Sequence, residues 1–267
     1  YYPTRTELGI LESKAGEIAA FLGSGTVLVE PGAGAPTKAQ KLLAAMNKPL
    51  AYAPGDISID HLEEATRPLR TEFPQLKITP FQLDFDNEIE LPEAVSALGP
   101  VAIFFPGSTI GNFSPEGARG LLRRFWNIEN SQSLLIGVDL KKDKAKLERA
   151  YDDPEGVTAA FNLNLLARAN RELLTDFDLS SFRHFARYDE TLGRVEMHLQ
   201  SICNQTVNVL GEPIHFAEGE SIHTENSYKF KIADFQKMAV ESGWSPVHVW
   251  TDPNHLFAEL AFSKINP

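Results

Sequence analysis

The stretch that most constrains the fold is a short apolar run followed by a glycine turn and an amphipathic segment. Residues 26–29 are β-branched or apolar, which is typical of a strand buried on both faces of a parallel sheet. Gly32 and Gly34 follow Glu30 and allow the backbone to turn tightly and to approach a ligand closely. A strand, a glycine turn and a helix in this order predict the first unit of a nucleotide-binding α/β sheet.

The turn lacks features of two common nucleotide sites. A dinucleotide fingerprint has a third glycine or alanine where the helix opens, whereas this helix opens with Pro36, Thr37 and Lys38, and there is no phosphate-loop motif. Glu30 would repel phosphates and suits a cationic or neutral ligand, such as the sulfonium and amino group of S-adenosylmethionine (SAM). The glycine pair alone is equally compatible with a plain strand–helix turn, because such pairs are common in loops.

The composition narrows the classes of partner. The chain has 25 basic and 36 acidic residues, a net charge of −11, and no Lys/Arg-rich run. Nucleic acid and anionic membranes are poor candidates, because binding to them relies on a basic face. No apolar stretch is long enough to span a bilayer, and the single cysteine, Cys203, fits a reducing compartment. We therefore expect a cytoplasmic protein that binds neither nucleic acid nor membranes.

Strand-like and helix-like segments alternate over the first half of the chain. After the glycine turn, four more strands are expected at 49–54, 76–85, 100–105 and 133–140. Ser58 is a suitable N-cap for a helix over 59–73, and Ser114 followed by Pro115 starts another helix. Strands that alternate with helices form a parallel sheet, so ligands are expected at the carboxyl ends of these strands.

Polar side chains end or follow four of these strands: Glu30, Asp56, Asp84 and Asn112. Their gathering at one edge of the sheet strengthens the case for a ligand site well beyond the glycine pair. The competing interpretation is that acidic residues commonly cap strand ends and the helices that follow.

The pattern changes after Lys141. Two helices are expected with no strand between them, then a hairpin and a polar loop, at 143–151, 154–174, 185–189 with 194–203, and 204–220. A helix from Lys229 to Gly243 and strands at 247–250 and 256–262 then resume the first pattern. A separate α+β block is therefore inserted into an α/β domain.

Several longer segments resemble those of one family; they are 1–7, 106–112, 137–143, 150–153, 156–162, 195–197 and 224–230. In this order, and over essentially the whole chain, they resemble the SAM-dependent amino-acid Nα-methyltransferases whose best-known member trimethylates L-histidine to hercynine in ergothioneine biosynthesis. The resemblance implies a Rossmann-like class I methyltransferase sheet over 5–141 and 229–267, with an inserted α+β substrate-recognition domain over 1–4 and 142–228.

The resemblance also implies a cofactor site for SAM at the strand ends. Its residues are Gly32, Gly34 and Lys38 for the methionine half, Asp56 for the ribose, Asp84 and Phe85 for the adenine, and Gly107 and Thr109 where cofactor and substrate meet. A carboxylate can accept both protons of a diol, which is the physical reason for an aspartate at the ribose.

The implied substrate site has Asn112 and Tyr151 for the α-carboxylate, Glu225 and Ser227 for the imidazole, and Tyr1 and Met197 as pocket walls. A carboxylate and a hydroxyl can together satisfy both imidazole nitrogens, and a buried glutamate favours a ring that carries a donor. The competing interpretations are that Glu225 and Ser227 cap the following helix, and that Tyr151 and Met197 are core residues.

The expected reaction is a direct displacement in which the neutral α-amine attacks the sulfonium methyl. It depends mainly on alignment, so Asn112, Tyr151 and Glu225 are expected to orient the substrate, and the sequence names no convincing general base. No metal site is expected, because the seven histidines show no paired spacing with carboxylates or cysteine. We expect a monomer.

Two alternatives stay open. An enzyme for tryptophan or another aromatic amino acid would keep the chemistry, although Glu225 and Met197 favour histidine. A catalytically inactive cofactor-binding module would fit the altered glycine motif, in which Pro31 and Ala33 depart from the family's usual residues; Gly55 is a further departure. The family also has an N-terminal segment with a pocket tyrosine, and this chain begins after it, so we expect a truncated chain with an incomplete substrate lid.

Overall fold

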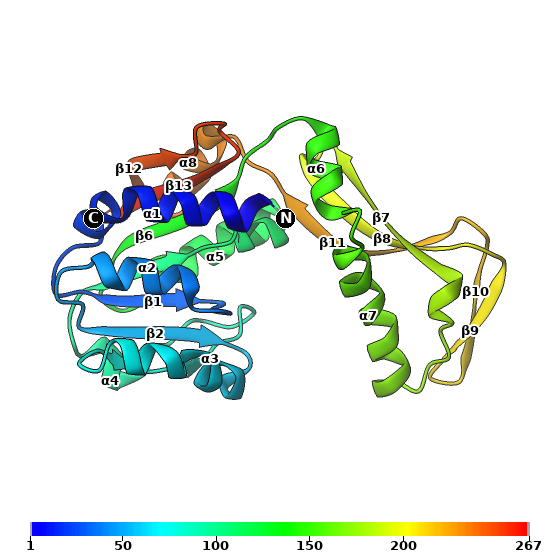
Figure 1. Ribbon diagram of the computed structural model, residues 1–267, viewed down its shortest axis with the longest axis horizontal. Helices are drawn as coiled ribbons and strands as arrows, with labels where there is room; N and C mark the ends of the chain where they lie inside the picture. The colour runs from blue at the N-terminus through cyan, green and yellow to red at the C-terminus, as the bar shows by residue number, and fades with distance from the viewer. Residues whose placement is uncertain (1, 266–267) are drawn as a thin grey trace. The chain divides into compact units, whose positions relative to one another are not determined.

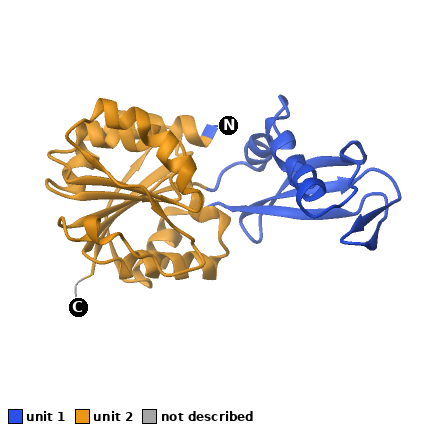
Figure 2. Cartoon of the chain, turned by 90° about the horizontal axis from the view of Figure 1, so that it is seen from below, with its two compact units in different colours: residues 1–2, 141–229 blue, residues 3–140, 230–267 orange. Residues whose placement is uncertain are grey.

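The computed structural model describes residues 2–265 (Figure 1), which form two compact units (Figure 2). The larger unit contains residues 3–140 and 230–265, and the smaller contains Tyr2 and Lys141–Lys229. The chain thus passes between the units at 140/141 and 229/230, where the sequence predicts 141/142 and 228/229. Within residues 2–265, none of the helices combines the length and the apolar character needed to cross a bilayer.

A single mixed sheet forms the centre of the larger unit. Its strands are β1 (Val27–Pro31), β2 (Ala51–Asp56), β3 (Lys77–Ile78), β4 (Phe81–Gln82), β5 (Val101–Phe105), β6 (Ser131–Asp139), β12 (Trp244–Thr251) and β13 (Phe257–Lys264). The order across the sheet is β12-β13-β6-β5-β1-β2-β3, and β4 also pairs with β2. The pairs among β1 to β6 are parallel, whereas β12 and β13 add an antiparallel edge. The predicted α/β fold class is confirmed.

Helices cover both faces of this sheet. One face carries α1 (Tyr2–Leu22), α2 (Thr37–Ala45) and α3 (Ile59–Glu72), and the other carries α4 (Glu93–Ser96), α5 (Pro115–Asn127) and α8 (Ile232–Val240). Side chains along β1 alternate between the two layers, with Leu28 in the α1–α3 core and Val27 and Val29 in the other. Every residue of β1 and β5 is buried, as expected for parallel strands with helices on both sides.

The third predicted strand, 76–85, is interrupted in the structure. β3 and β4 both pair with β2 but are separated by Pro80, which has no N–H to donate to the sheet. Pairing resumes after the break, and the N–H of Leu83 donates to the Asp56 carbonyl at 3.0 Å. The alternating side chains predicted the position of this segment correctly, and Pro80 interrupts its pairing with β2.

The two predicted N-caps behave differently. The hydroxyl of Ser114 accepts a hydrogen bond from the N–H of Gly117 at 3.1 Å, so it caps α5 as predicted. Ser58 stands at the N-cap position of α3, but its side chain makes no capping hydrogen bond. Its own N–H instead donates to Asp56 Oδ1 at 2.9 Å, so the predicted cap is wrong.

The smaller unit packs two helices on an antiparallel sheet. Its elements are α6 (Lys144–Tyr151), α7 (Val157–Glu172), the short 3-10 turn η2 (Leu179–Ser181), β7 (Phe182–Asp189), β8 (Arg194–Ser201), β9 (Gln205–Val209), β10 (Glu212–Phe216) and β11 (Ser221–Tyr228). α6 and α7 confirm the two predicted helices, and the antiparallel pairing of β7 with β8 confirms the predicted hairpin, to which β11 adds a third strand. The predicted polar loop is wrong in part, because it contains the β9–β10 hairpin. Leu210 and Gly211 form its turn, both with positive φ, as a type I′ hairpin turn requires.

Gly55, a departure from the family's usual residue, is enclosed by its neighbours. A Cβ added there would lie 2.6 Å from Phe81 Cζ and 3.0 Å from Leu83 Cδ1. The Phe81 ring therefore fills the space that a larger side chain would need.

Replacement of Gly55 by valine should destabilise the larger unit. Overpacking typically costs about 1–3 kcal/mol of unfolding free energy, which urea denaturation can measure. Gly16 of α1 is a matched control, because no atom lies within 4 Å of a Cβ added there. Gly16→Ala should raise the unfolding free energy by about 0.5–1 kcal/mol. A Gly55→Val variant as stable as the wild type would contradict the packing of Phe81 on Gly55.

Candidate functional site

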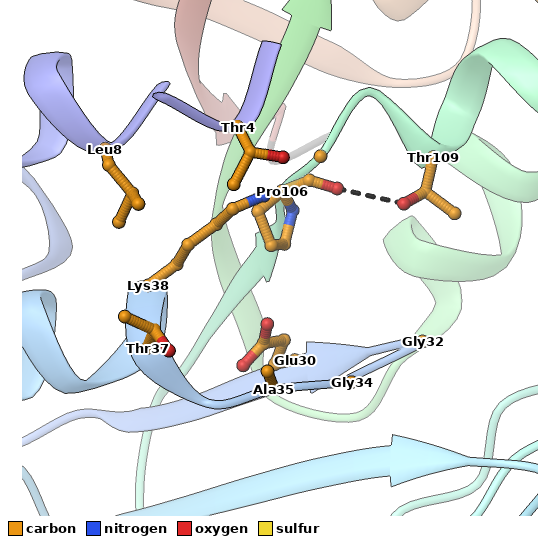
Figure 3. Close-up of a pocket in the computed structure, with 11 residues that line it drawn as sticks. Thr4, Leu8, Glu30, Gly32, Gly34, Ala35, Thr37, Lys38, Pro106 and Thr109 are labelled. Atoms are coloured by element: carbon orange, nitrogen blue, oxygen red, sulfur yellow. Dashed lines mark hydrogen bonds between the residues drawn. The ribbon is translucent and has the colours of Figure 1, made fainter. Parts of the chain in front are cut away.

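A cavity of about 320 Å³ opens in the larger unit beyond the carboxyl ends of β1 and β5 (Figure 3). Its lining residues are Thr4, Leu8, Glu30, Gly32, Gly34, Ala35, Thr37, Lys38, Pro106, Gly107 and Thr109. In Figure 3 the Lys38 side chain reaches across from α2 toward Pro106, and the Glu30 carboxyl group points into the space. The cavity brings together five of the predicted cofactor residues: Gly32, Gly34, Lys38, Gly107 and Thr109.

The glycine turn forms one wall of the cavity. Gly32 has φ +70°, and a Cβ added there would lie 2.9 Å from Phe85 Cζ. The N–H groups of Gly32 and Ala33 both donate to the Gly55 carbonyl, at 2.7 and 3.0 Å. Phe85 lies against this turn and makes edge-to-face contacts with two phenylalanine rings of the core. Backbone hydrogen bonds therefore hold the turn, and the turn does not need a side-chain hydroxyl at position 33, where this chain has alanine.

Asp56 ends β2 and Asp84 follows the neighbouring β4 at the same edge of the sheet, but neither lines this cavity. Asp56 is half-buried, and its Oδ1 holds the Ser58 N–H. Asp84 is exposed and accepts hydrogen bonds at 3.0 Å from Asp86 N–H and from Asn87 Nδ2. Their roles at the ribose and the adenine stay predictions.

Glu30, on the cavity wall, has a pKa that is shifted from its ordinary value. It is 3% exposed, and its carboxyl accepts a hydrogen bond from the hydroxyl of Tyr52. Burial raises the pKa of Glu30 to about 7, against the lowering effects of Tyr52 and Lys38. Near neutral pH this carboxyl is partly uncharged, so it repels an anionic ligand less than its sequence position suggests.

Asn112 lies on a turn that follows β5. It ends the 3-10 helix η1 (Thr109–Asn112) and is exposed. Ser108 before this helix has φ +56°, and its hydroxyl accepts a hydrogen bond from the Asp139 N–H at 2.9 Å. Thr109 donates its hydroxyl to the Pro106 carbonyl at 3.0 Å. The turn is therefore fixed between the ends of β5 and β6.

Four predicted substrate residues meet in the smaller unit. Met197 lies directly opposite Glu225 in the β8–β11 ladder, and Ser227 follows two residues later on the same face. The Tyr151 hydroxyl at the end of α6 is 2.8 Å from Ser227 Oγ. Met197, Ser227 and Tyr151 are buried, and Glu225 is half-buried.

The other two predicted substrate residues are Tyr1 and Asn112. Tyr1 is outside the described residues. Asn112 belongs to the larger unit and Tyr151 to the smaller, so their pairing on one carboxylate stays a prediction.

Lys229 joins this cluster and was not among the residues predicted from the sequence. It is 2% exposed, and its Nζ donates to the Tyr151 hydroxyl at 2.6 Å and to Ser227 Oγ at 2.8 Å. The ammonium also lies 4.5 Å from the centroid of the Tyr151 ring. Burial raises the pKa of Glu225 above its usual range, and the positive charge of Lys229 opposes this rise.

The segment before α8 is a strand, so the alternative that Glu225 and Ser227 cap a helix is wrong. β11 runs to Tyr228, and α8 begins only at Ile232, after Lys231 at its N-cap position. Alternation of side chains along a strand places 225, 227 and 229 on one face. That spacing is the signal in the sequence that would have found Lys229.

The opposite face of this small sheet brings together Glu196, His198 and His223, with potential metal-ligand atoms within 4.8 Å of one another. The two imidazole rings are stacked, with centroids 4.7 Å apart, so their lone pairs do not converge. Burial alone would raise the pKa of Glu196, but hydrogen bonds from Arg194, Arg187 and His198 lower it to about 2. Two arginines thus occupy the carboxylate that a metal would need.

A doubly wound sheet with a cavity beyond the carboxyl ends of its parallel strands defines a nucleotide-binding type of α/β protein. Comparisons with known proteins narrow this class. Residues 1–264 match the family described as histidine-specific, SAM-dependent methyltransferases. Among solved structures, a SAM-dependent methyltransferase from Clostridium acetobutylicum has the same fold, with a TM-score of 0.55 and 9% identity over 97% of this chain and 92% of that one.

Curated relatives agree with this family. The chain is 40% identical over 260 residues to the histidine N-alpha-methyltransferase of Mycolicibacterium smegmatis, covering 95% of this chain and 79% of that protein. It is 37% identical over 259 residues to the protein of the same name from Mycobacterium tuberculosis, covering 94% and 79%. Ergothioneine biosynthesis protein 1 of Neurospora crassa is 30% identical over 99% of this chain, which spans 31% of that longer protein.

The chain therefore belongs to the family of histidine-specific, SAM-dependent methyltransferases. It is a SAM-dependent N-methyltransferase by family and fold, which confirms the resemblance and the cofactor predicted from the sequence.

The raised pKa of Glu30 predicts a pH-dependent gain in stability for Glu30→Gln. A carboxyl with a raised pKa in the folded state stabilises the fold below its ordinary pKa, near 4.5, and this contribution is lost as the pH rises through about 7. Relative to the wild type, Glu30→Gln should gain on the order of 3 kcal/mol between pH 4.5 and pH 8, as measured by urea denaturation. The exposed Glu129 is the control, and Glu129→Gln should show no such trend. A constant difference between Glu30→Gln and the wild type at all pH values would contradict the assignment.

Proposed function

We propose that this protein transfers methyl groups from SAM to the α-amino group of L-histidine and forms Nα,Nα,Nα-trimethylhistidine (hercynine), as a step of ergothioneine biosynthesis. The observation that carries the substrate assignment is the face shared by Met197, Glu225 and Ser227, beside Tyr151 and Lys229. The names of the curated relatives support histidine as the substrate. We further expect a monomeric, cytoplasmic enzyme without a nucleic-acid partner.

The larger unit would hold SAM. The ammonium of Lys38 would bind the carboxylate of the methionine half, Asp56 the ribose, and Asp84 with Phe85 the adenine. Two observations support a fit to this ligand: no atom lies within 4 Å of a Cβ added at Gly34, so the wall is open there, and Glu30 can be uncharged near neutral pH. When bound, SAM supplies a methyl group on a positively charged sulfur.

The smaller unit would hold the amino acid. Glu225 would accept a hydrogen bond from one imidazole nitrogen, and Ser227 would contact the other. Tyr151 and Asn112 would bind the α-carboxylate. A hydroxyl that accepts a hydrogen bond from an ammonium is a stronger donor, so Lys229 would strengthen the hold of Tyr151 on that carboxylate.

These residues act by orientation. Fixing both the ring and the carboxylate leaves the α-amine in one position, and alignment of reacting groups can contribute roughly 7–11 kcal/mol to lowering a barrier. No acid or base is assigned to the described residues of the cluster, because the attacking amine is neutral. Glu225 is therefore a binding residue, and its replacement should affect substrate affinity first.

The reaction itself tests the proposal. With SAM and L-histidine, mass spectrometry should detect mono-, di- and trimethylated histidine, and with L-tryptophan it should detect no methylated product. Methylation of tryptophan alone would favour the aromatic alternative, and binding of S-adenosylhomocysteine (SAH) without any product would favour an inactive module. Accumulation of the dimethyl form would contradict hercynine as the end product.

Glu225→Ala should weaken histidine binding without weakening cofactor binding. Loss of a hydrogen bond to a charged group costs about 1.5–3 kcal/mol, which corresponds to a rise of the histidine Kd by roughly ten-fold or more. Calorimetric titration of L-histidine in the presence of SAH measures this change, and SAH titration alone checks the cofactor site. Glu190→Ala, at an exposed turn of the same sheet, is the matched control. Unchanged histidine affinity in Glu225→Ala would overturn the assignment of the imidazole site.

A further inference from the structure

Three buried carboxyl groups surround one lysine in the larger unit. Glu7 of α1 and Glu259 of β13 are 0% exposed, and Glu30 of β1 is 3% exposed. They lie in the layer between the sheet and helices α1–α3, where Lys38 of α2 enters from the cavity. Burial of a charged group costs several kcal/mol unless it is paired, so this arrangement needs a compensating set of contacts.

Glu7 contacts one residue from each of two walls of the cavity without lining the cavity itself. Its Oε1 accepts a hydrogen bond from the Gly107 N–H at 2.7 Å, and its Oε2 forms an ion pair with Lys38 Nζ. Gly107 and Lys38 line the cavity, whereas Glu7 does not. Any effect of Glu7 on a ligand is therefore exerted through these two neighbours.

Glu259 brings a second carboxyl group against Glu7. Neither oxygen of Glu259 has a hydrogen-bond donor among the described residues unless a proton lies between the two acids. Burial, and next the charge of the neighbouring Glu7, raise the pKa of Glu259 well above its usual range. Two adjacent carboxylates cannot both be ionised in such a site, so the pair holds one proton.

Gly137 provides the room for this pair. It lies opposite Glu259 in the β6–β13 ladder. A Cβ added at Gly137 would lie 2.5 Å from Glu7 Oε1 and 3.0 Å from the Phe257 ring. A glycine in the middle of a central strand is costly in itself, and here it lets the Glu7 carboxylate reach the Gly107 amide.

We propose that Glu7 and Glu259 share one proton and act as a pair of positioning residues for SAM, holding Lys38 and the turn at Gly107 in their binding geometry. Glu259 is the neutral acid and donates its proton to Glu7. Glu7 keeps the negative charge that balances the Lys38 ammonium. Helix α1, which also contributes Thr4 and Leu8 to the cavity wall, is thereby part of the cofactor site.

Calorimetric titration of SAH into variants of the full chain tests the pairing. Glu7→Gln removes the ion pair to Lys38 and should raise the SAH Kd by about ten-fold or more, which corresponds to about 1.4 kcal/mol. Glu259→Ala should approach the same loss. Glu259→Gln should lose only about two- to three-fold, because an amide N–H can replace the O–H of a neutral acid but cannot mimic a carboxylate.

The matched control is an exposed ion pair between the same two helices. Glu12 of α1 pairs with Lys41 of α2 at 2.9 Å, with exposed fractions of 55% and 43%. Glu12→Gln should leave the SAH Kd unchanged, because exposed pairs contribute little. A loss in Glu12→Gln equal to that in Glu7→Gln would mean that any contact between α1 and α2 matters, and it would overturn the specific role of Glu7.

Infrared spectroscopy gives a readout that does not depend on affinity. The difference spectrum between the wild type and Glu259→Gln at neutral pH should contain the carbonyl band of a protonated carboxylic acid. This measurement stands even if Glu7→Gln fails to fold. Absence of the band, or a Glu259→Gln variant as impaired in SAH binding as Glu259→Ala, would overturn the shared proton.

Discussion

Burial of the parallel sheet on both faces is the constraint on which the rest of this structure depends. β1 and β5 have no exposed residue, so a polar group can reach a ligand only where a strand ends. The glycine turn after β1 and the turn at Gly107 after β5 therefore share one edge and one cavity. Asp56 and Asp84 stand at the same edge because β2 and β4 run parallel to β1.

The same burial makes each internal charge dependent on a partner. In the larger unit the Tyr52 hydroxyl satisfies Glu30, an ammonium and an amide N–H satisfy Glu7, and a proton neutralises Glu259. In the smaller unit, one buried charge has the opposite sign: the ammonium of Lys229 is held by two hydroxyls. Each of these sets of contacts lies directly beside residues that are predicted from the sequence to bind the cofactor or the substrate.

Much of the fold could be predicted because it follows from local patterns in the sequence. Apolar runs, glycine turns and a Ser-Pro helix start predicted the parallel sheet and α5. The errors arise where local pattern and tertiary pairing disagree. Pro80 interrupts an alternating segment, and Leu210 with Gly211 makes a hairpin turn without the usual Asn-Gly signal. β11 contains Glu225, Asn226 and Ser227, which are not typical strand residues, so neither this strand nor the side that carries its proposed ligand residues was predicted.

The candidate sites were predictable to a similar degree and for the same reason. The glycine turn and the polar strand ends lead to one cavity, because strand ends of a parallel sheet must converge. Lys229 could be predicted only if β11 was first assigned as a strand, and the polar residues of that segment obscured the assignment. The sequence gives no signal that Glu7 and Glu259 meet, since they come from opposite ends of the chain and approach each other only when α1 lies over β6 and β13.

Gly137 has a consequence for how such a protein can change during evolution. Its missing side chain is useful only while an acid occupies position 7, and that acid is tolerable only while Lys38 balances its charge and Glu259 stays protonated beside it. Replacing only one of these four residues leaves the other three without their partner, so an exchange of the set one residue at a time passes through a less fit intermediate. Residues 7, 38, 137 and 259 should therefore be inherited together and covary across relatives as one unit, although they lie on four separate elements of the chain.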